Sequence, residues 1–334
     1  MLELKHLSAR YDTVSGYVNA VDDVNLTIKR NEIFGIAGES GCGKSTLLKV
    51  MYDLIQFPLE IFRGEVSLEC RNKDGSITVC HSGEIHKSWW QLISYIPQGA
   101  MHVMNPVTRV RNQFFDTVSK YHKRRSKREM EADIVQYLRE LELPADVLGA
   151  YPHQLSGGMR QRVLIALATF LSPEIVLADE PTTALDVVVQ RGILTMLKRT
   201  QKRLGNSMVI VSHDMGVHYQ ITDRLGIMYA GKLIEAGPTM DIFERPSHPY
   251  TRMLIAALPR LGDSSQKEGI PGTPPSLRNP PPGCRFAERC PEAAEHCRTA
   301  EPLNYQVGKD HGASCHLLDG KVPLSEDEGG QAHG

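Results

Sequence analysis

Residues 38–45 read Gly-Glu-Ser-Gly-Cys-Gly-Lys-Ser and combine three glycines with one lysine and two hydroxyl groups. Glycine lets backbone N–H groups turn toward an anion without obstruction by side chains. The lysine can place its charge on the β- and γ-phosphates of a nucleotide, and a serine hydroxyl is a natural ligand for Mg²⁺. We predict that this loop binds phosphate through Gly38, Ser40, Gly41, Cys42, Gly43, Lys44, Ser45 and Thr46.

The surroundings of this loop support a phosphate site. An apolar run over residues 33–37 precedes it and a helical pattern follows it, which is the strand–loop–helix setting of a P-loop. A second apolar run, residues 175–178, ends in the carboxylates Asp179 and Glu180. Open α/β sheets bind ligands at the carboxyl ends of their strands. We therefore predict that Asp179 holds Mg²⁺ through water and that Glu180 polarises the water that attacks the γ-phosphate.

Strand-length apolar runs recur at residues 33–37, 92–96, 175–178 and 208–211, with helical patterns between them. This alternation predicts one α/β domain over residues 1–237, with a largely parallel sheet covered by helices. Prolines then become frequent, and we predict an extended connector over 238–283. A small irregular extension with four cysteines is predicted over 284–320, and we expect the polar tail 321–334 to be disordered.

The bulk composition limits the function. The 334 residues carry a formal net charge of −1, so no overall basic field indicates nucleic-acid binding. A membrane span needs about 20 consecutive apolar residues, and the best stretch, residues 163–178, is shorter and is interrupted by polar residues. No signal-peptide pattern begins the chain. We expect a cytoplasmic protein whose membrane role, if it has one, depends on partner chains.

The class of P-loop enzyme is indicated by the motifs between and around these two elements. Residues 155–159, Leu-Ser-Gly-Gly-Met, resemble the LSGGQ signature of ABC ATPases and differ from it at Met159. Gln98 resembles the Q-loop glutamine, residues 184–186 resemble the D-loop, and His213 resembles the switch histidine. These motifs follow one another in the order that the family requires, over residues 1–237.

The resemblance implies the fold and the site of that family. It implies a RecA-like core with an antiparallel β part and a helical subdomain at about residues 99–158. It also implies two ATP molecules between two subunits, each bound by the P-loop of one chain and by the signature residues Ser156, Gly157 and Gly158 of the other. Asp186 of the D-loop is a further nucleotide-binding residue. Gln98 and His213 would contact Mg²⁺ and the γ-phosphate, respectively. Tyr11 occupies the place of the adenine-stacking aromatic residue, with Tyr17 as the alternative.

The C-terminal part narrows the resemblance to dipeptide/oligopeptide importers. The segments that carry it are residues 248–251, 274–277 and 283–290. Members of that subfamily that import oligosaccharides or nickel are the alternatives for cargo. The resemblance implies a peripheral location on the cytoplasmic face of the cell membrane. It also implies two permease subunits docked at residues 99–111, a second ATP-binding subunit (a paralogue or a copy) and an extracytoplasmic substrate-binding protein.

Two other functions are possible for such a chain. One is a soluble ABC ATPase that acts on DNA or ribosomes, but this chain has one P-loop and no room for a long coiled coil between Gln98 and Ser156. The other is a non-enzymatic scaffold or redox sensor, against which the intact Glu180 and His213 argue.

Four cysteines, Cys284, Cys290, Cys297 and Cys315, have the spacing C-x5-C-x6-C-x17-C. Zinc sites usually contain tight C-x2-C pairs, which are absent here. Four thiolates with unequal gaps are compatible with a [4Fe–4S] cluster, and some members of the subfamily resemble that case. Zinc and reduced or disulfide-linked cysteines are the alternatives, and His296, His311 and His316 are near enough in sequence to act as substitute ligands.

Overall fold

The structure is a computed structural model that describes residues 1–71, 76–99, 103–121, 126–258 and 269–324. Its larger sheet combines strands from both halves of the chain. These are β3 (Ile33–Ala37), β6 (Ile93–Ile96), β7 (Ile175–Asp179), β8 (Ser207–Val211), β9 (Arg224–Tyr229), β10 (Lys232–Pro238), β11 (Asn304–Gly308) and β12 (His311–Ser314). Within the described residues their order is β11-β12-β10-β9-β3-β8-β7-β6. The pairs from β9 to β6 are parallel, as the apolar runs predict, while β10, β12 and β11 continue the sheet as antiparallel strands.

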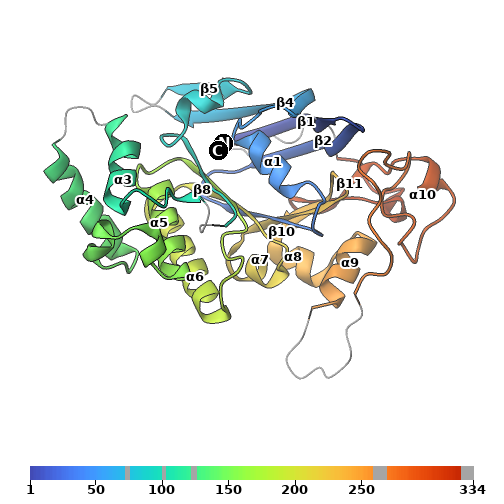
Figure 1. The fold of residues 1–334 in the computed structure, drawn as a ribbon. Helices are drawn as coiled ribbons and strands as arrows, with labels where there is room; N and C mark the ends of the chain where they lie inside the picture. Colours follow the sequence, from blue (N-terminus) through green and yellow to red (C-terminus); the bar gives the residue numbers. More distant parts are fainter. Residues whose placement is uncertain (72–75, 100–102, 122–125, 259–268, 325–334) are drawn as a thin grey trace.

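A second sheet is antiparallel and lies beside the first (Figure 1). It consists of β1 (Leu2–Thr13), β2 (Gly16–Ile28), β4 (Leu59–Arg71) and β5 (Ile77–His81), in the order β2-β1-β4-β5. The apolar side chains of β1, β2 and β4 form one core cluster with β3 and the helix α1 (Lys44–Met51). This packing attaches the antiparallel part firmly to the strand and helix that flank the phosphate loop.

Within the described residues, the other helices cover the larger sheet or extend from it. They are α3 (Val110–Ser119), α4 (Lys127–Glu140), α5 (Gly157–Thr169), α6 (Val187–Leu204), α7 (Met215–Ile221), α8 (Thr239–Glu244), α9 (Pro249–Ala256) and α10 (His296–Thr299). Short 3-10 turns occur at η1 (Ile85–Ser88), η2 (Ala145–Gly149), η3 (Pro152–Gln154) and η4 (His316–Leu318). A capping box between Ser126 and Glu129 starts α4, whose buried residues Met130, Ile134 and Leu138 lie on one face. Figure 1 shows α3 and α4 at one end of the molecule and the segment with α10 at the other.

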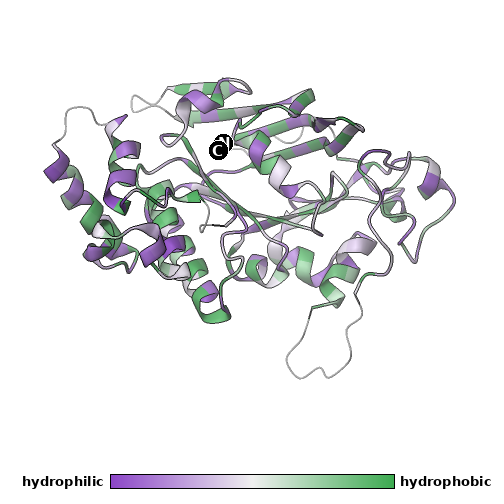
Figure 2. Ribbon diagram, viewed as in Figure 1, coloured by the Kyte–Doolittle hydropathy of each residue, from purple (hydrophilic) through white to green (hydrophobic). Residues whose placement is uncertain are grey.

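The hydropathy of the strands explains their position. Every residue of β3, β7 and β8 is buried, as expected for parallel strands with helices on both faces. Figure 2 shows these strands as mostly hydrophobic, whereas α4 alternates between hydrophobic and hydrophilic residues. No helix in the described ranges combines the length and the apolar character that crossing a bilayer requires.

The connector predicted over 238–283 is wrong in its first part, which contains α8 and α9. Pro249 does not prevent a helix because it occupies the first turn of α9, where its missing N–H is not needed, and His248 caps that turn. In residues 269–283 the structure has neither helix nor strand. Residues 259–268 of the predicted connector lie outside the described residues.

The cysteine segment 284–320 contains α10, β11, β12 and η4 besides its loops. The β11–β12 hairpin pairs with β10 and thereby satisfies backbone groups at an otherwise open sheet edge. The tail also begins later than predicted, since Leu324 N–H donates to the Asn304 carbonyl at 2.9 Å and the Gln306 N–H donates to the Val322 carbonyl at 3.0 Å. The rest of the predicted tail, 325–334, lies outside the described residues.

Candidate functional site: a nucleotide site and a cysteine hollow

The predicted phosphate loop lies between the buried strand β3 and the N-terminus of α1. Gly38 and Gly43 have φ angles of 151° and 108°, and a Cβ at Gly43 would collide with the carbonyl oxygen of Ala20. The buried Lys44 ammonium donates to the carbonyl oxygens of Gly38 at 2.7 Å and Glu39 at 2.8 Å. The loop therefore presents a fixed positive charge beside the N–H groups of a helix N-terminus, an arrangement that binds phosphate.

Ser45 and Asp179 lie side by side, as a magnesium site requires. The Ser45 hydroxyl donates to Asp179 Oδ1 at 3.0 Å, and the Tyr95 hydroxyl donates to Oδ2 at 2.9 Å. Burial raises the pKa of the Asp179 carboxyl, and the hydrogen bonds from Tyr95 and Ser45 offset only part of this effect. A buried carboxylate and a neighbouring hydroxyl fit Mg²⁺, which prefers oxygen ligands and would compensate for the desolvation.

The three predicted catalytic residues converge on one carboxylate. Gln98 Nε2 donates to Glu180 Oε2 at 2.9 Å, and His213 Nδ1 lies 3.0 Å from Glu180 Oε1. The Thr183 hydroxyl also donates to Oε2, at 2.7 Å. Burial disfavours the charged form of Glu180, but the hydrogen bonds from His213 and Thr183 outweigh it and hold the pKa of Glu180 below its ordinary value. The ionised carboxylate can therefore accept a proton from water or orient it.

The signature and D-loop residues cap two adjacent helices. The Ser156 hydroxyl accepts the Met159 N–H at 3.3 Å at the start of α5, and Asp186 Oδ1 accepts the Val189 N–H at 2.9 Å at the start of α6. A Cβ at Gly158 would approach a Val189 methyl group to 2.8 Å, so glycine allows these helix ends to lie close together. Methionine at position 159 leaves the serine cap intact because the cap uses its backbone N–H.

The structure does not bring the signature to the phosphate loop of the same chain. The helix α5 packs against α3, α4 and α6, whereas α1 contacts β1, β2 and β4, and Figure 1 shows the two helices apart. The predicted phosphate-loop site and the predicted signature site therefore lie in separate parts of one chain.

The two candidate adenine-stacking tyrosines lie in different surroundings. The Tyr11 hydroxyl lies 3.2 Å from the Thr46 hydroxyl of α1. The ring of Tyr17 lies under the guanidinium of Arg10, at 3.6 Å from the ring centroid, and the residue is 46% exposed. Tyr11 therefore lies next to the phosphate loop, while one face of Tyr17 is already covered. The stacking role of Tyr11 stays a prediction.

The four clustered cysteines line one hollow in the C-terminal segment. All four are free thiols rather than disulfides. Burial raises the pKa of Cys284 and Cys290, and it raises the pKa of Cys315 to about 11. These three thiols therefore favour the neutral form, and a bound metal would have to replace their protons.

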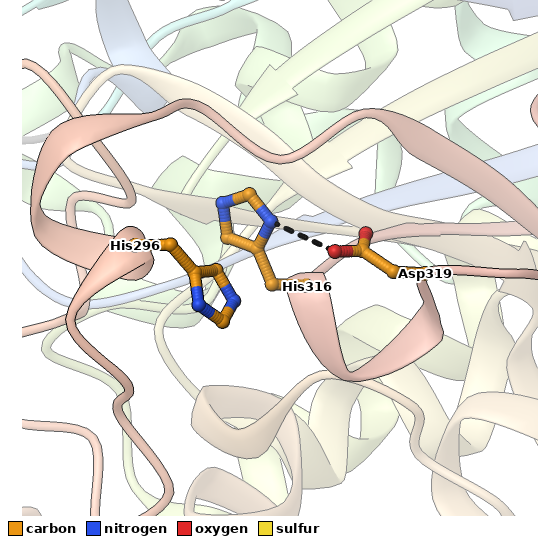
Figure 3. A group of neighbouring side chains, drawn as sticks. All are labelled: His296, His316 and Asp319. Carbon is orange, nitrogen blue, oxygen red and sulfur yellow. Dashed lines mark hydrogen bonds and ion pairs between the residues drawn. The ribbon is translucent and has the colours of Figure 1, made fainter.

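The three histidines that are candidate substitute ligands lie in different surroundings. His311 is buried and pairs with Glu235 at 2.8 Å, so it serves the packing of the extension on the sheet. His316 lines the cysteine hollow. The ring of His296 is perpendicular to that of His316, and the two ring centroids are 4.8 Å apart (Figure 3).

Comparisons with known proteins agree with both parts of this description. The profile of the ABC transporter family matches residues 21–183, and that of the oligopeptide/dipeptide transporter C-terminal region matches residues 234–297. The chain is 38% identical over 326 residues to the dipeptide transport ATP-binding protein DppD of Caldanaerobacter subterraneus subsp. tengcongensis, which covers 97% of this chain and 99% of that protein. It is also 38% identical to the oligopeptide transport ATP-binding protein OppD of Bacillus subtilis, over 98% and 91% of the two chains.

This chain belongs to the ABC transporter family.

Solved structures support the same conclusion. The ABC ATPase is 30% identical to MJ0796, a bacterial ABC transporter cassette solved as a dimer, with a TM-score of 0.61 over 72% of this chain and 99% of that one. The same cassette has been solved in a post-hydrolysis state with ADP and Pi. The predicted family, the cassette fold and the ATPase activity are therefore confirmed.

Sequence reasoning missed several groups that complete the site of this ABC ATPase. The Tyr95 hydroxyl donates a hydrogen bond to Asp179, and the Thr183 hydroxyl donates one to Glu180. Neither side chain belongs to a motif used above. Glu39 is a carboxylate inside the phosphate loop, and a negative charge so close to a phosphate site was a signal that a cation could pair with it. The structure identifies the cation as Arg289, from the cysteine segment.

Proposed function

We propose that this ABC ATPase powers the import of dipeptides or oligopeptides through a membrane transporter. The observation that carries the proposal is the match of residues 234–297 to the C-terminal region of oligopeptide/dipeptide transporters. This region packs on the cassette through buried contacts, so it is an integral part of the ATPase. Relatives over nearly the whole chain bear the names of dipeptide and oligopeptide transport proteins.

The nucleotide site would work by positioning and electrostatics. Lys44 and the loop N–H groups would bind the β- and γ-phosphates, while Ser45 and Asp179 would hold Mg²⁺, which neutralises charge on the phosphates. Gln98 would leave its present contact with Glu180 to reach the metal. The ionised Glu180 would then orient the attacking water.

A complete site would need a second subunit, because the signature of one chain lies far from its own P-loop. Ser156, Gly157, Gly158 and Asp186 would close over ATP bound to a partner, either a paralogue or a copy of this chain. His213 would contact the γ-phosphate. The dimeric MJ0796 cassette supports such a pairing.

The subunit would lie on the cytoplasmic face of the membrane and dock two permease subunits through residues 99–111, of which 100–102 lie outside the described residues. A substrate-binding protein on the other side of the membrane would deliver the peptide.

Uptake measurements test the cargo. Cells of the source organism that lack this chain are expected to lose uptake of labelled di- and oligopeptides, and the wild-type chain, but not Glu180→Gln, should restore it. The uptake of nickel and of labelled oligosaccharides is measured in the same cells as a control. Loss of nickel or oligosaccharide uptake, with peptide uptake intact, would contradict the peptide proposal and leave the ATPase assignment untouched.

We also propose that the cysteine hollow holds a [4Fe–4S] cluster, which would supply four iron–thiolate bonds that join separate loops of the segment. Four free thiols around one hollow fit such a group. A single zinc ion needs its ligand atoms close together, at about 2.3 Å from the metal. In the described residues the set compact enough for one ion is His296, His316 and Asp319, rather than any group of cysteines.

Metal analysis tests the cluster. Protein purified without oxygen is expected to contain iron and acid-labile sulfide near four atoms each per chain. A variant with serine at positions 284, 290, 297 and 315 should contain neither, while Cys80→Ser, outside the hollow, should keep both. Stoichiometric zinc in the wild type would contradict the cluster.

A further inference from the structure

The C-terminal segment reaches the phosphate loop through one arginine. Arg289 lies between Cys284 and Cys290 in sequence, and its guanidinium forms a two-pronged ion pair with Glu39, the second residue of the loop. Nη1 donates to Glu39 Oε2 at 2.8 Å and Nη2 donates to Oε1 at 2.9 Å. Paired bonds of this kind fix orientation as well as charge.

The guanidinium is held so that it cannot turn away. Nε donates to the Pro271 carbonyl at 2.7 Å, Nη2 to the Ile270 carbonyl at 3.1 Å and Nη1 to the Tyr229 hydroxyl at 3.1 Å. Together with the pair to Glu39, these bonds occupy all five N–H groups of an arginine side chain. Arg289 is only 9% exposed.

Glu39 is also held through its backbone. Its N–H donates to the Tyr250 hydroxyl at 3.1 Å, and its carbonyl oxygen accepts from Lys44 Nζ at 2.8 Å. Tyr250 lies on α9 and packs with Tyr229 and Phe286 at ring centroid distances of 4.7 and 5.3 Å. The conformation of the phosphate loop therefore depends on residues beyond position 238.

We propose that Arg289 is a positioning residue for nucleotide binding. A carboxylate beside bound phosphates repels them, and an arginine that pairs with it and directs it away removes that repulsion. Arg289 thus has two effects on Glu39: it neutralises the charge and fixes the loop whose N–H groups bind phosphate. The cysteine segment becomes a structural requirement for ATP binding.

The charge part of this proposal has a specific signature. Arg289→Ala in the full chain is expected to weaken ATP binding by about tenfold or more, because Glu39 becomes an unpaired negative charge near the phosphates. Glu39→Gln alone should change the Kd little. The double variant should recover most of the affinity, since the repelling charge is gone. Loss of packing alone would not be rescued in this way.

The measurement is the Kd for ATP of each variant, with the KM and kcat of ATP hydrolysis in the assembled transporter as a second readout. We expect KM to rise and kcat to change less. Arg298→Ala is the matched control, because Arg298 lies in the same segment and pairs with the exposed Glu288. An unchanged Kd for Arg289→Ala, or a double variant as weak as Arg289→Ala, would overturn the proposal.

If Arg289→Ala does not fold, Arg289→Lys provides the test. Lysine keeps the charge but cannot form the two-pronged contact, so an intermediate rise in Kd is expected. A Kd equal to that of the wild type would overturn the proposal.

A second group of residues forms a separate candidate metal site. His296 begins α10, His316 begins η4 and Asp319 follows η4, and one ligand atom from each lies within 4.8 Å of the others (Figure 3). His316 Nε2 lies 3.0 Å from the Ala300 carbonyl oxygen, which can only accept, so Nε2 carries the hydrogen and Nδ1 faces Asp319. The Tyr305 hydroxyl donates to Asp319 Oδ1 at 2.7 Å. Such outer hydrogen bonds orient metal-binding side chains.

The spacing of the two facing atoms fits a metal ion. His316 Nδ1 and Asp319 Oδ2 are 3.4 Å apart, which is longer than the 2.7–2.9 Å or so of a charge-assisted hydrogen bond. Ligands at about 2.0–2.1 Å from a tetrahedral zinc ion are separated by about 3.4 Å. We infer that His296, His316 and Asp319 bind a divalent transition-metal ion such as Zn²⁺, with water completing the coordination. The ion would join α10 to η4, next to Cys297 and Cys315.

Cobalt(II) is the probe for this site. The full chain, purified without oxygen, is expected to bind one equivalent of Co²⁺ with visible bands but no thiolate charge-transfer band, and Zn²⁺ should displace it. His316→Ala and Asp319→Ala should abolish this binding. His6→Ala is the matched control, since His6 forms a surface pair with Asp23 at 2.9 Å. A thiolate band, no bound cobalt, or binding unaffected by His316→Ala would overturn the inference.

Discussion

The nucleotide site and the cysteine hollow are built in opposite ways. The phosphate loop, Asp179 and Glu180 follow buried strands of one sheet, so short stretches of sequence already carry the chemistry and the geometry. The cysteines lie on loops, a short helix and the end of a hairpin. They converge through distant contacts, which include the pairing of β12 with β10 and the packing of Cys284 and Cys290 on the core around Tyr250. A site at strand ends can be recognised from local motifs, whereas a site on loops depends on distant contacts.

The two regions also differ in their charges. Glu180 has a pKa below its ordinary value because hydrogen bonds from His213 and Thr183 outweigh burial, so it is ionised before substrate arrives. The thiols of Cys284, Cys290 and Cys315 have raised pKa values and are neutral without metal. The first site is preorganised for its ligand, and the second must release protons to bind a metal.

Glu180→Gln should have the largest effect of the four predictions, and this effect should be limited to the nucleotide site. The amide cannot accept a proton from water, so turnover is expected to fall by about 10²–10⁴-fold while ATP binding persists. Phosphate release and ATP binding measure the two quantities, with Glu174→Gln as control because Glu174 pairs with Arg30 on the surface. Turnover within a few-fold of the wild type would remove Glu180 from the mechanism.

Phe286→Ala tests whether the two regions share one core. Phe286 is 1% exposed and contacts Tyr229 and Tyr250, so its truncation is expected to lower the free energy of unfolding by about 3–5 kcal/mol. Chemical denaturation measures the loss, and both iron content and ATP affinity should fall with it. Phe57→Ala, at a residue 86% exposed, should change neither. If only the iron content fell, the regions would be energetically separate.

The pH dependence of metal-free protein should show a smaller effect, limited to the cysteine hollow. The pKa of Cys315 rises from 9.0 to about 11 on folding, so the folded chain holds this proton more tightly. The resulting stability is present below pH 9 and is lost as the pH rises through 11, which predicts a decrease in Tm of about 2–4 °C.

The control for this prediction is Cys315→Ser, which should show a smaller decrease in Tm over the same pH range. Identical decreases in the two proteins would show that Cys315 does not contribute.

Tyr95→Phe should have the smallest effect of the four. It removes the hydroxyl that donates to Asp179 Oδ2, a contribution of about 1 kcal/mol, so the Mg²⁺ concentration for half-maximal turnover is expected to rise about fivefold. Tyr121→Phe is the control, because the Tyr121 hydroxyl donates to the Trp89 carbonyl instead. An equal response of the two variants would indicate a general packing effect.

Local sequence was sufficient for much of the cassette. The strands predicted at 33–37, 92–96, 175–178 and 208–211 agree with β3, β6, β7 and β8 to within one residue at each end. Buried parallel strands are recognisable because they are short, continuous apolar runs. The contacts among Gln98, Glu180 and His213 follow from motif positions at the ends of such strands.

Local sequence was misleading where proline was taken to exclude regular structure. Residues near Pro249 form α9 because that proline occupies a first helical turn, and a proline count does not reveal which turn a residue enters. The β11–β12 hairpin was missed because its strands are short and polar, and they are stabilised by the edge of β10 rather than by their own propensity.

The sequence by itself therefore determined the enzyme class and the positions of the phosphate loop, the two carboxylates and the signature. Only the tertiary structure decided what surrounds them. Glu39 and Arg289 are 250 positions apart, and no local pattern predicts their ion pair. It forms because the C-terminal segment packs against β9 and α9, and burial then requires each charge to have a partner. The physical reason is that motifs encode chemistry over a few residues, whereas desolvation and packing act between segments that meet only in the folded chain.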